Sequence, residues 1–93
     1  MTVNFLIPRP LRSMTGGHSH LHVETSGGTL RDALEALFAA YPAIRDRVFT
    51  EQGEIREHVN VFVGNTVARW MDGLATPIAD GEEISIIPAI SGG

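Results

Sequence analysis

The spacing of apolar residues predicts one long helix in the first half of the chain. Between positions 30 and 41, apolar side chains recur every three or four residues and form a single stripe: Leu30, Ala33, Leu34, Leu37, Phe38 and Tyr41. Thr29 suits the N-cap, and the Asp32 carboxylate favours the positive end of the helix dipole. Pro42 ends the helix, because the residue before a proline is disfavoured in the α region. A short second helical turn is expected at residues 43–49.

Shorter segments in the first part of the chain predict two strands joined by a loop. Residues 2–7 are rich in β-forming side chains and stop at Pro8. Residues 9–17 are expected to form a loop, because they contain Pro10 and a pair of glycines. Residues 18–23 alternate between apolar and polar positions, which is typical of a half-buried strand.

Three further strands are predicted in the second half of the chain. Alternating valines mark the first of them, and Gly64-Asn65 suits a tight hairpin turn. Residues 66–70 are expected to form a short return strand, and residues 83–88 form the last strand. The order strand–strand–helix–strand–strand–strand (ββαβββ) predicts an α+β fold with one main helix packed on one face of a mixed sheet.

The length and net charge narrow the class of protein. The 93 residues suffice for one domain, because domains typically contain about 50 to 250 residues. We expect a folded domain at residues 1–88 and a flexible tail at residues 89–93. No segment approaches the ~20 apolar residues of a membrane helix, and the N-terminus lacks a signal-peptide pattern, so the cytoplasm is the expected location. The formal net charge of −4 argues against a nucleic-acid partner, which would require a basic surface.

Two residue types are missing from the sequence, and both absences limit its chemistry. There is no cysteine, so the chain carries no thiol nucleophile and no thiolate metal site. There is also no lysine, and an arginine guanidinium does not accept acyl groups at neutral pH. Ser19, the serine beside histidines, is expected on the opposite face of its strand from them. We therefore expect the protein not to be an enzyme.

Three histidines at alternate positions raise the question of a metal site. His18, His20 and His22 alternate along one predicted strand and project from the same face. Residues two apart on a strand are separated by nearly 7 Å, by about 3.3 Å per residue, which is awkward for tetrahedral ligation. We predict a solvent-facing strand and no metal site.

Two apolar residues are expected on the face of the sheet that the helix leaves open. Phe62 alternates with the core-facing valines of its strand, and Ile87 has the same relation to Ile84 and Ile86. Apolar side chains that cluster on an exposed face are typical of docking surfaces, so we predict that Phe62 and Ile87 contact a partner.

The most informative segment is the end of the sequence, Ser91-Gly92-Gly93, which follows the last predicted strand. Glycine has no Cβ and adopts positive and negative φ equally well, so such a segment can enter a narrow active site of another protein. We predict that Gly93 is the reacting residue through its carboxylate, that Gly92 provides steric clearance, and that Pro88, Ala89, Ile90 and Ser91 guide the tail.

The predicted order of elements together with the terminal glycines resembles the ubiquitin-like β-grasp fold. Within that fold the chain is similar to bacterial sulfur carriers: the small subunit of molybdopterin synthase, the thiamine sulfur carrier and the carrier for cysteine synthesis. The most specific match is residues 74–93, LATPIADGEEISIIPAISGG. Residues 7–12, IPRPLR, and residues 15–17, TGG, resemble the cysteine-synthesis branch in particular.

The resemblance implies a set of reactions and partners. An ATP-dependent adenylating and sulfurating enzyme would convert the Gly93 carboxylate to an acyl adenylate and then to a thiocarboxylate. A sulfur-acceptor enzyme, either a pyridoxal-phosphate cysteine synthase or the large subunit of molybdopterin synthase, would then take the sulfur, and a zinc peptidase would release cysteine. The resemblance thus implies that the chain has no cofactor of its own and that ATP, pyridoxal phosphate and zinc belong to its partners.

Two other functions remain open. The chain could be a ubiquitin-like modifier joined through Gly93 to lysines of target proteins, which target adducts on a denaturing gel would reveal. It could also be a β-grasp interaction module with an inert tail, which would be indifferent to deletion of Gly92 and Gly93.

Overall fold

The computed structural model describes residues 1–88, and these contain the predicted succession of elements. The strands and α-helices are β1 (Thr2–Leu6), β2 (His20–Glu24), α1 (Leu30–Ala40), α2 (Arg45–Val48), β3 (Val59–Val63), β4 (Thr66–Val67) and β5 (Glu83–Pro88). Short 3₁₀ helices connect them: η1 (Arg9–Thr15), η2 (Pro42–Ile44), η3 (Ala68–Trp70) and η4 (Gly73–Ala75).

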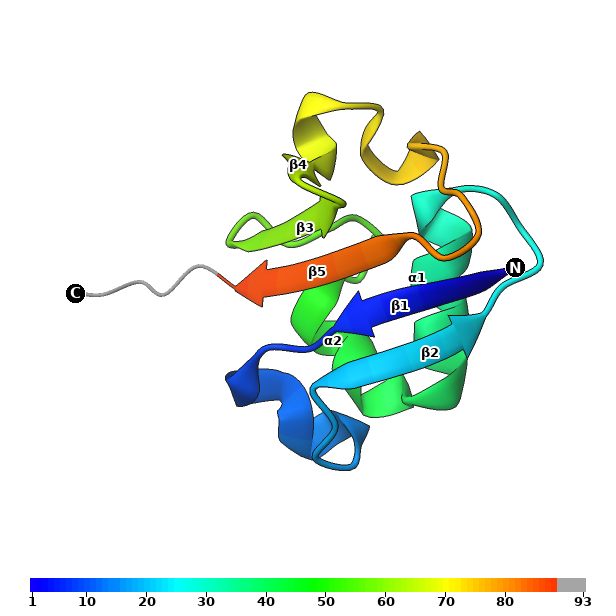
Figure 1. Ribbon diagram of the computed structural model, residues 1–93. Coiled ribbons are helices and arrows are strands. Elements are labelled where there is room, and N and C mark those ends of the chain that lie inside the picture. The colour runs from blue at the N-terminus through cyan, green and yellow to red at the C-terminus, as the bar shows by residue number, and fades with distance from the viewer. Residues whose placement is uncertain (89–93) are drawn as a thin grey trace.

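The five strands form one mixed sheet in the order β2-β1-β5-β3-β4 (Figure 1). β5 pairs in parallel with β1 on one side and antiparallel with β3 on the other. The last strand of the sequence therefore lies in the middle of the sheet. It ends at Pro88, at the edge of the molecule opposite the N-terminus (Figure 1).

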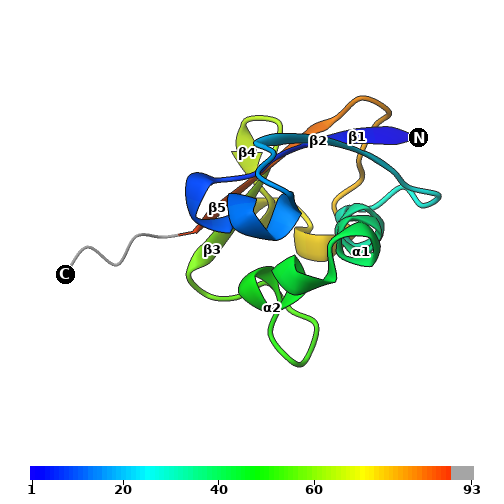
Figure 2. The same cartoon turned by 90° about the horizontal axis from the view of Figure 1, so that it is seen from below.

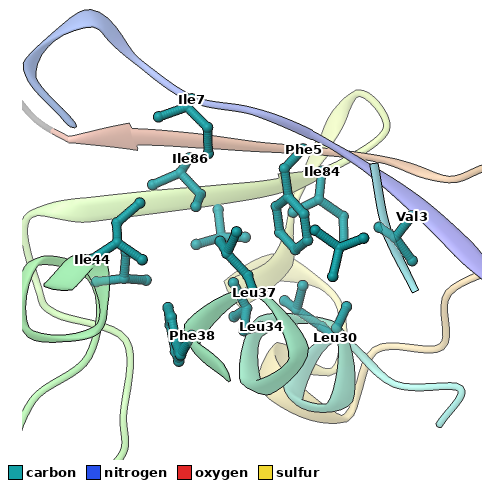
Figure 3. Close-up of a cluster of buried hydrophobic side chains, with 14 of the residues drawn as sticks. Val3, Phe5, Ile7, Leu30, Leu34, Leu37, Phe38, Ile44, Ile84 and Ile86 are labelled. Atoms are coloured by element: carbon teal, nitrogen blue, oxygen red, sulfur yellow. The ribbon is translucent and has the colours of Figure 1, made fainter. Parts of the chain in front are cut away.

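The helices cover one face of this sheet, as the view turned by 90° shows (Figure 2). Five residues of the predicted stripe are buried, and Tyr41, the sixth, packs at the edge of the core. Leu34 and Leu37 of α1 face Phe5, Ile84 and Ile86 of the sheet (Figure 3). The alternation of the strands places these sheet residues on one face, so helix and sheet bury each other's apolar side chains.

The start of α1 is fixed by a capping box. The Thr29 hydroxyl oxygen accepts a hydrogen bond from the Asp32 backbone N–H at 3.3 Å, and the Asp32 carboxylate accepts one from the Thr29 N–H at 3.2 Å. This reciprocal arrangement satisfies two backbone donors that the first turn would otherwise leave unpaired.

Three predicted boundaries were wrong. Residues 9–15 form the 3₁₀ helix η1 instead of a loop, because Pro10 is tolerated in its first turn and Gly16, at φ 68°, ends it. The return strand stops at Val67, and residues 68–70 form η3. β2 begins at His20, so His18 precedes the strand. The short second helical turn was confirmed as η2 followed by α2.

Candidate functional site

The face of the sheet opposite α1, here called the open face, divides into a polar half and an apolar half. On β1 and β2 it carries mainly polar side chains, including Thr2, Asn4, His20, His22 and Glu24. On β3, β4 and β5 it carries three large apolar side chains: Phe62, Val67 and Ile87. The apolar half lies over the strand that ends at Pro88, which makes it the candidate for contact with another protein.

A groove lies on the apolar half, around the β3–β4 hairpin. Its volume is about 420 Å³, and its lining residues are Asn60, Phe62, Asn65, Thr66, Val67, Arg69 and Trp70. Trp70 is 78% exposed. An amphipathic aromatic ring beside an apolar hollow is an arrangement that protein interfaces favour.

The hairpin brings two apolar residues of the groove together. Gly64, at φ 62°, and Asn65 form the two-residue turn, and this turn pairs Phe62 with Val67. Val67 is buried although it lies outside the main core, and Phe62 is half-buried. A small apolar cluster thus exists on the face of the sheet that the helices do not cover.

One polar atom of the groove lacks a partner. The side-chain oxygen of Asn60 is buried and makes no hydrogen bond within residues 1–88. Asn60 pairs with Ile87 of β5, so this acceptor lies next to the exposed apolar side chain of the central strand. A buried acceptor without a hydrogen bond costs free energy.

The predicted site residues fall into two groups. Phe62 and Ile87 lie on the open face, as the alternation predicted, although Phe62 is only partly exposed because it lines the groove. Pro88 is the last residue of β5 and pairs with Val59. The remaining predicted residues, Ala89, Ile90, Ser91, Gly92 and Gly93, lie outside the described residues. Contact of Phe62 and Ile87 with a partner remains a prediction.

The histidines do not share one strand. His20 and His22 are exposed on β2, whereas His18 lies in the turn that follows η1. The His20 ring is 2.9 Å from the Ser19 hydroxyl, and the His22 ring contacts the Asn4 side chain. Among residues 1–88, no three histidine, cysteine, aspartate or glutamate side chains are grouped closely enough to hold a metal ion.

Sequence reasoning missed Asn60, Arg69 and Trp70 as parts of the groove. The hairpin sequence could have indicated the position of the groove, because a two-residue turn at Gly64-Asn65 places Phe62 opposite Val67 on the open face. The position of Trp70 could not follow from it, because η3 replaces the continuation of the strand.

No helix within residues 1–88 combines the length and the apolar composition that crossing a membrane requires.

Comparison with known proteins gives a consistent set of similarities. The model of the ThiS family matches residues 5–93. The sulfur carrier protein CysO of Mycobacterium tuberculosis is 39% identical over 95 residues, covering 100% of both chains.

Two solved structures superpose along nearly the whole chain. The crystal structure of SAMP1 from Haloferax volcanii gives a TM-score of 0.86 at 32% identity and covers 100% of both chains. The CysO of the Amycolatopsis orientalis BexX/CysO complex gives a TM-score of 0.87 at 30% identity, covering 98% of this chain and 99% of that one. The predicted ubiquitin-like β-grasp fold is confirmed.

Proposed function

Because the chain belongs to the ThiS family, we propose that it is a sulfur carrier whose C-terminal carboxylate at Gly93 is converted to a thiocarboxylate. The observation that carries the proposal is the similarity to CysO over the full length of both chains, at 39% identity. That similarity favours cysteine biosynthesis as the destination of the sulfur.

The proposed reaction needs a partner that activates the carboxylate. A C-terminal carboxylate is ionised at neutral pH and is therefore a poor electrophile. Its oxygen attacks the α-phosphorus of ATP, which releases pyrophosphate and leaves an acyl adenylate. Sulfide or a persulfide then attacks the carbonyl carbon and displaces AMP; a persulfide adduct needs a further thiol to free the thiocarboxylate.

The composition of the chain suits this chemistry. An acyl adenylate acylates accessible amines, but no lysine is present in the sequence. The absence of cysteine likewise removes any thiol that could capture the activated group as a thioester. In a complex with its activating enzyme, no lysine amine or cysteine thiol of the carrier would compete with the incoming sulfur.

The open face would dock onto the partner that receives the tail. Phe62 and Ile87 supply the apolar contact, and β5 leads directly from Ile87 through Pro88 to residues 89–93. A docked sheet face fixes the start of the tail, so only five residues remain to be positioned by the partner's active site.

The sulfur acceptor in this proposal is a pyridoxal-phosphate enzyme. Its pyridoxal phosphate would supply an electrophilic amino-acid carbon to which the Gly93 thiocarboxylate would add. The adduct would rearrange to an amide, from which a zinc peptidase would release cysteine. The large subunit of molybdopterin synthase is the alternative acceptor. In either case ATP, pyridoxal phosphate or zinc would be bound by the partners.

The intact mass of the protein from its native cells, measured before and after alkylation, tests the proposal. We expect a species in which one oxygen is replaced by sulfur and which is alkylated at Gly93. A plain carboxylate in both sulfur-starved and sulfur-replete cells would contradict it.

A second candidate function is protein modification, which the similarity to SAMP1, a small archaeal modifier protein, favours. In that case Gly93 would be joined to lysines of other proteins. Adducts of higher mass that persist on a denaturing gel, and that disappear when Gly92 and Gly93 are deleted, would support this alternative.

A further inference from the structure

A second groove, here called the Arg12 notch, lies where β1 leaves the sheet. Its volume is about 300 Å³, and it is bounded by apolar Leu6, Pro8 and Ile87 and by polar Arg12, Ser19 and His20. Ile87 is the residue before Pro88, where β5 ends. The notch is therefore next to the point from which residues 89–93 continue.

The structure holds the Arg12 side chain in place. Its Nε donates a hydrogen bond of 3.0 Å to the Ile7 carbonyl oxygen. The Arg12 carbonyl in turn accepts from the Gly17 N–H at 2.7 Å and from the Thr15 hydroxyl at 3.2 Å. Thr15 is buried, so η1, the 3₁₀ helix that carries Arg12, is anchored at its C-terminal end.

The guanidinium keeps free hydrogen-bonding capacity. Of its five N–H donors, only the Nε donor is engaged within residues 1–88, and Arg12 forms no ion pair there. No carboxylate lines the notch. A fixed guanidinium presents its two terminal amino groups as a planar fork, which matches the two oxygens of a carboxylate.

Along β1 and β2, acidic and basic groups lie at opposite ends of the sheet. At the end of the sheet away from Pro88, Glu24 pairs with Thr2, and the Asp80 carboxylate accepts from the Thr2 N–H at 2.8 Å. At the other end, Leu6 pairs with His20, and η1 carries Arg9 and Arg12. On the β1 side of Pro88, a chain with a net charge of −4 thus presents the guanidinium groups of η1, whereas on the β3 side exposed Glu57 precedes Val59, the partner of Pro88.

We propose that the Arg12 notch binds a carboxylate side chain of the activating enzyme, at the mouth of the active site that receives residues 89–93. The apolar walls contact the aliphatic part of that side chain, and the Arg12 fork pairs with its oxygens. This inference rests on the proposed function, because it needs an enzyme that takes up the tail. The contact would fix the rotation of the carrier about the normal to the open face, which the apolar contact of Phe62 and Ile87 alone leaves undefined.

The test is the ATP-dependent adenylation of the carrier by its activating enzyme, followed as pyrophosphate release at varied carrier concentration. We expect Arg12→Gln to raise KM for the carrier about tenfold with little change in kcat, since loss of a partly desolvated ion pair costs at least ~1.4 kcal/mol. Arg9→Gln removes the same charge from an exposed position of η1 outside the notch and should change KM less than twofold. Arg12→Lys should recover part of the loss.

A salt titration separates docking from folding. The KM of the wild type should rise with ionic strength more steeply than that of Arg12→Gln, because the variant lacks the screened pair. Equal KM values for both proteins, or equal salt dependence, would overturn the proposal. So would a shift of the Arg12 side-chain NMR signals when residues 89–93 are deleted from the isolated carrier, since the tail would then occupy the notch. A wild-type carrier that is not adenylated at all would overturn the proposed function itself, and this inference with it.

Discussion

Ile86 and Ile87 are consecutive residues of β5, but their side chains lie on opposite faces of the sheet. Ile86 is 1% exposed in the core, whereas Ile87 is 47% exposed on the open face. We expect Ile86→Ala to lower the free energy of unfolding by about 2–5 kcal/mol, because it leaves a cavity under the helices. Ile87→Ala should lower it by less than about 1 kcal/mol. Urea denaturation of the two variants checks this, and equal losses would contradict the assignment of faces.

Trp70 tests whether the groove contributes to docking. We expect Trp70→Ala to change the free energy of unfolding by less than about 0.5 kcal/mol, because Trp70 is 78% exposed. The same variant should weaken binding to the activating or acceptor enzyme about tenfold, as removal of an aromatic anchor does. Isothermal titration calorimetry measures this effect.

Met71 provides the matched control for Trp70. It is adjacent in sequence and 44% exposed, but it does not line the groove. Met71→Ala should leave the affinity unchanged. Equal affinities for wild type and Trp70→Ala would show that the groove is not part of the interface.

Two neighbouring glycines before α1 should respond differently to the same substitution. A Cβ at Gly27 would lie 2.0 Å from the Asp32 carboxylate oxygen, whereas a Cβ at Gly28 would meet nothing within 4 Å. We expect Gly27→Ala to displace the Asp32 side chain from the capping box and to lower the free energy of unfolding by about 1 kcal/mol. Gly28→Ala should be neutral or slightly stabilising, because it restricts the unfolded chain. Thermal unfolding of the two variants distinguishes them, and similar melting temperatures would contradict the prediction.

The position of the terminal carboxylate is testable by adding one alanine after Gly93. The extra residue moves the carboxylate by up to about 3.6 Å and adds a Cβ beside it. We expect the variant to fold normally and to form no thiocarboxylate, as measured by intact mass after alkylation. Normal sulfur loading of the extended chain would contradict the role given to Gly93.

The helix and the faces of the strands could be predicted because both depend on local patterns. The stripe from Leu30 to Phe38 and the cap at Thr29 belong to one contiguous segment, and the hairpin at Gly64-Asn65 is specified by its own turn. The order of strands could not be predicted in the same way. β5 lies between β1 and β3, and only contacts between distant parts of the chain determine that position.

The candidate site could likewise be predicted only where it depends on local sequence patterns. Alternation alone places Phe62 and Ile87 on the open face. The groove at Trp70 depends on η3. The notch at Arg12 depends on the 3₁₀ helix η1, within residues 9–17, where Pro10 and the pair of glycines predict a loop. In both cases a side chain is positioned by an irregular segment whose geometry has no periodic signal in the sequence.

The central position of β5 in the sheet determines when the sheet can form during synthesis of the chain. β1 and β3 can pair with β5 only after residues 83–88 have left the ribosome, so the two halves of the sheet cannot join before then. In chains that stop before β5, the edges of β1 and β3 that face β5 stay unpaired, and such edges are exposed to aggregation and degradation. Folding itself therefore distinguishes chains that contain the central strand from chains that stop before it.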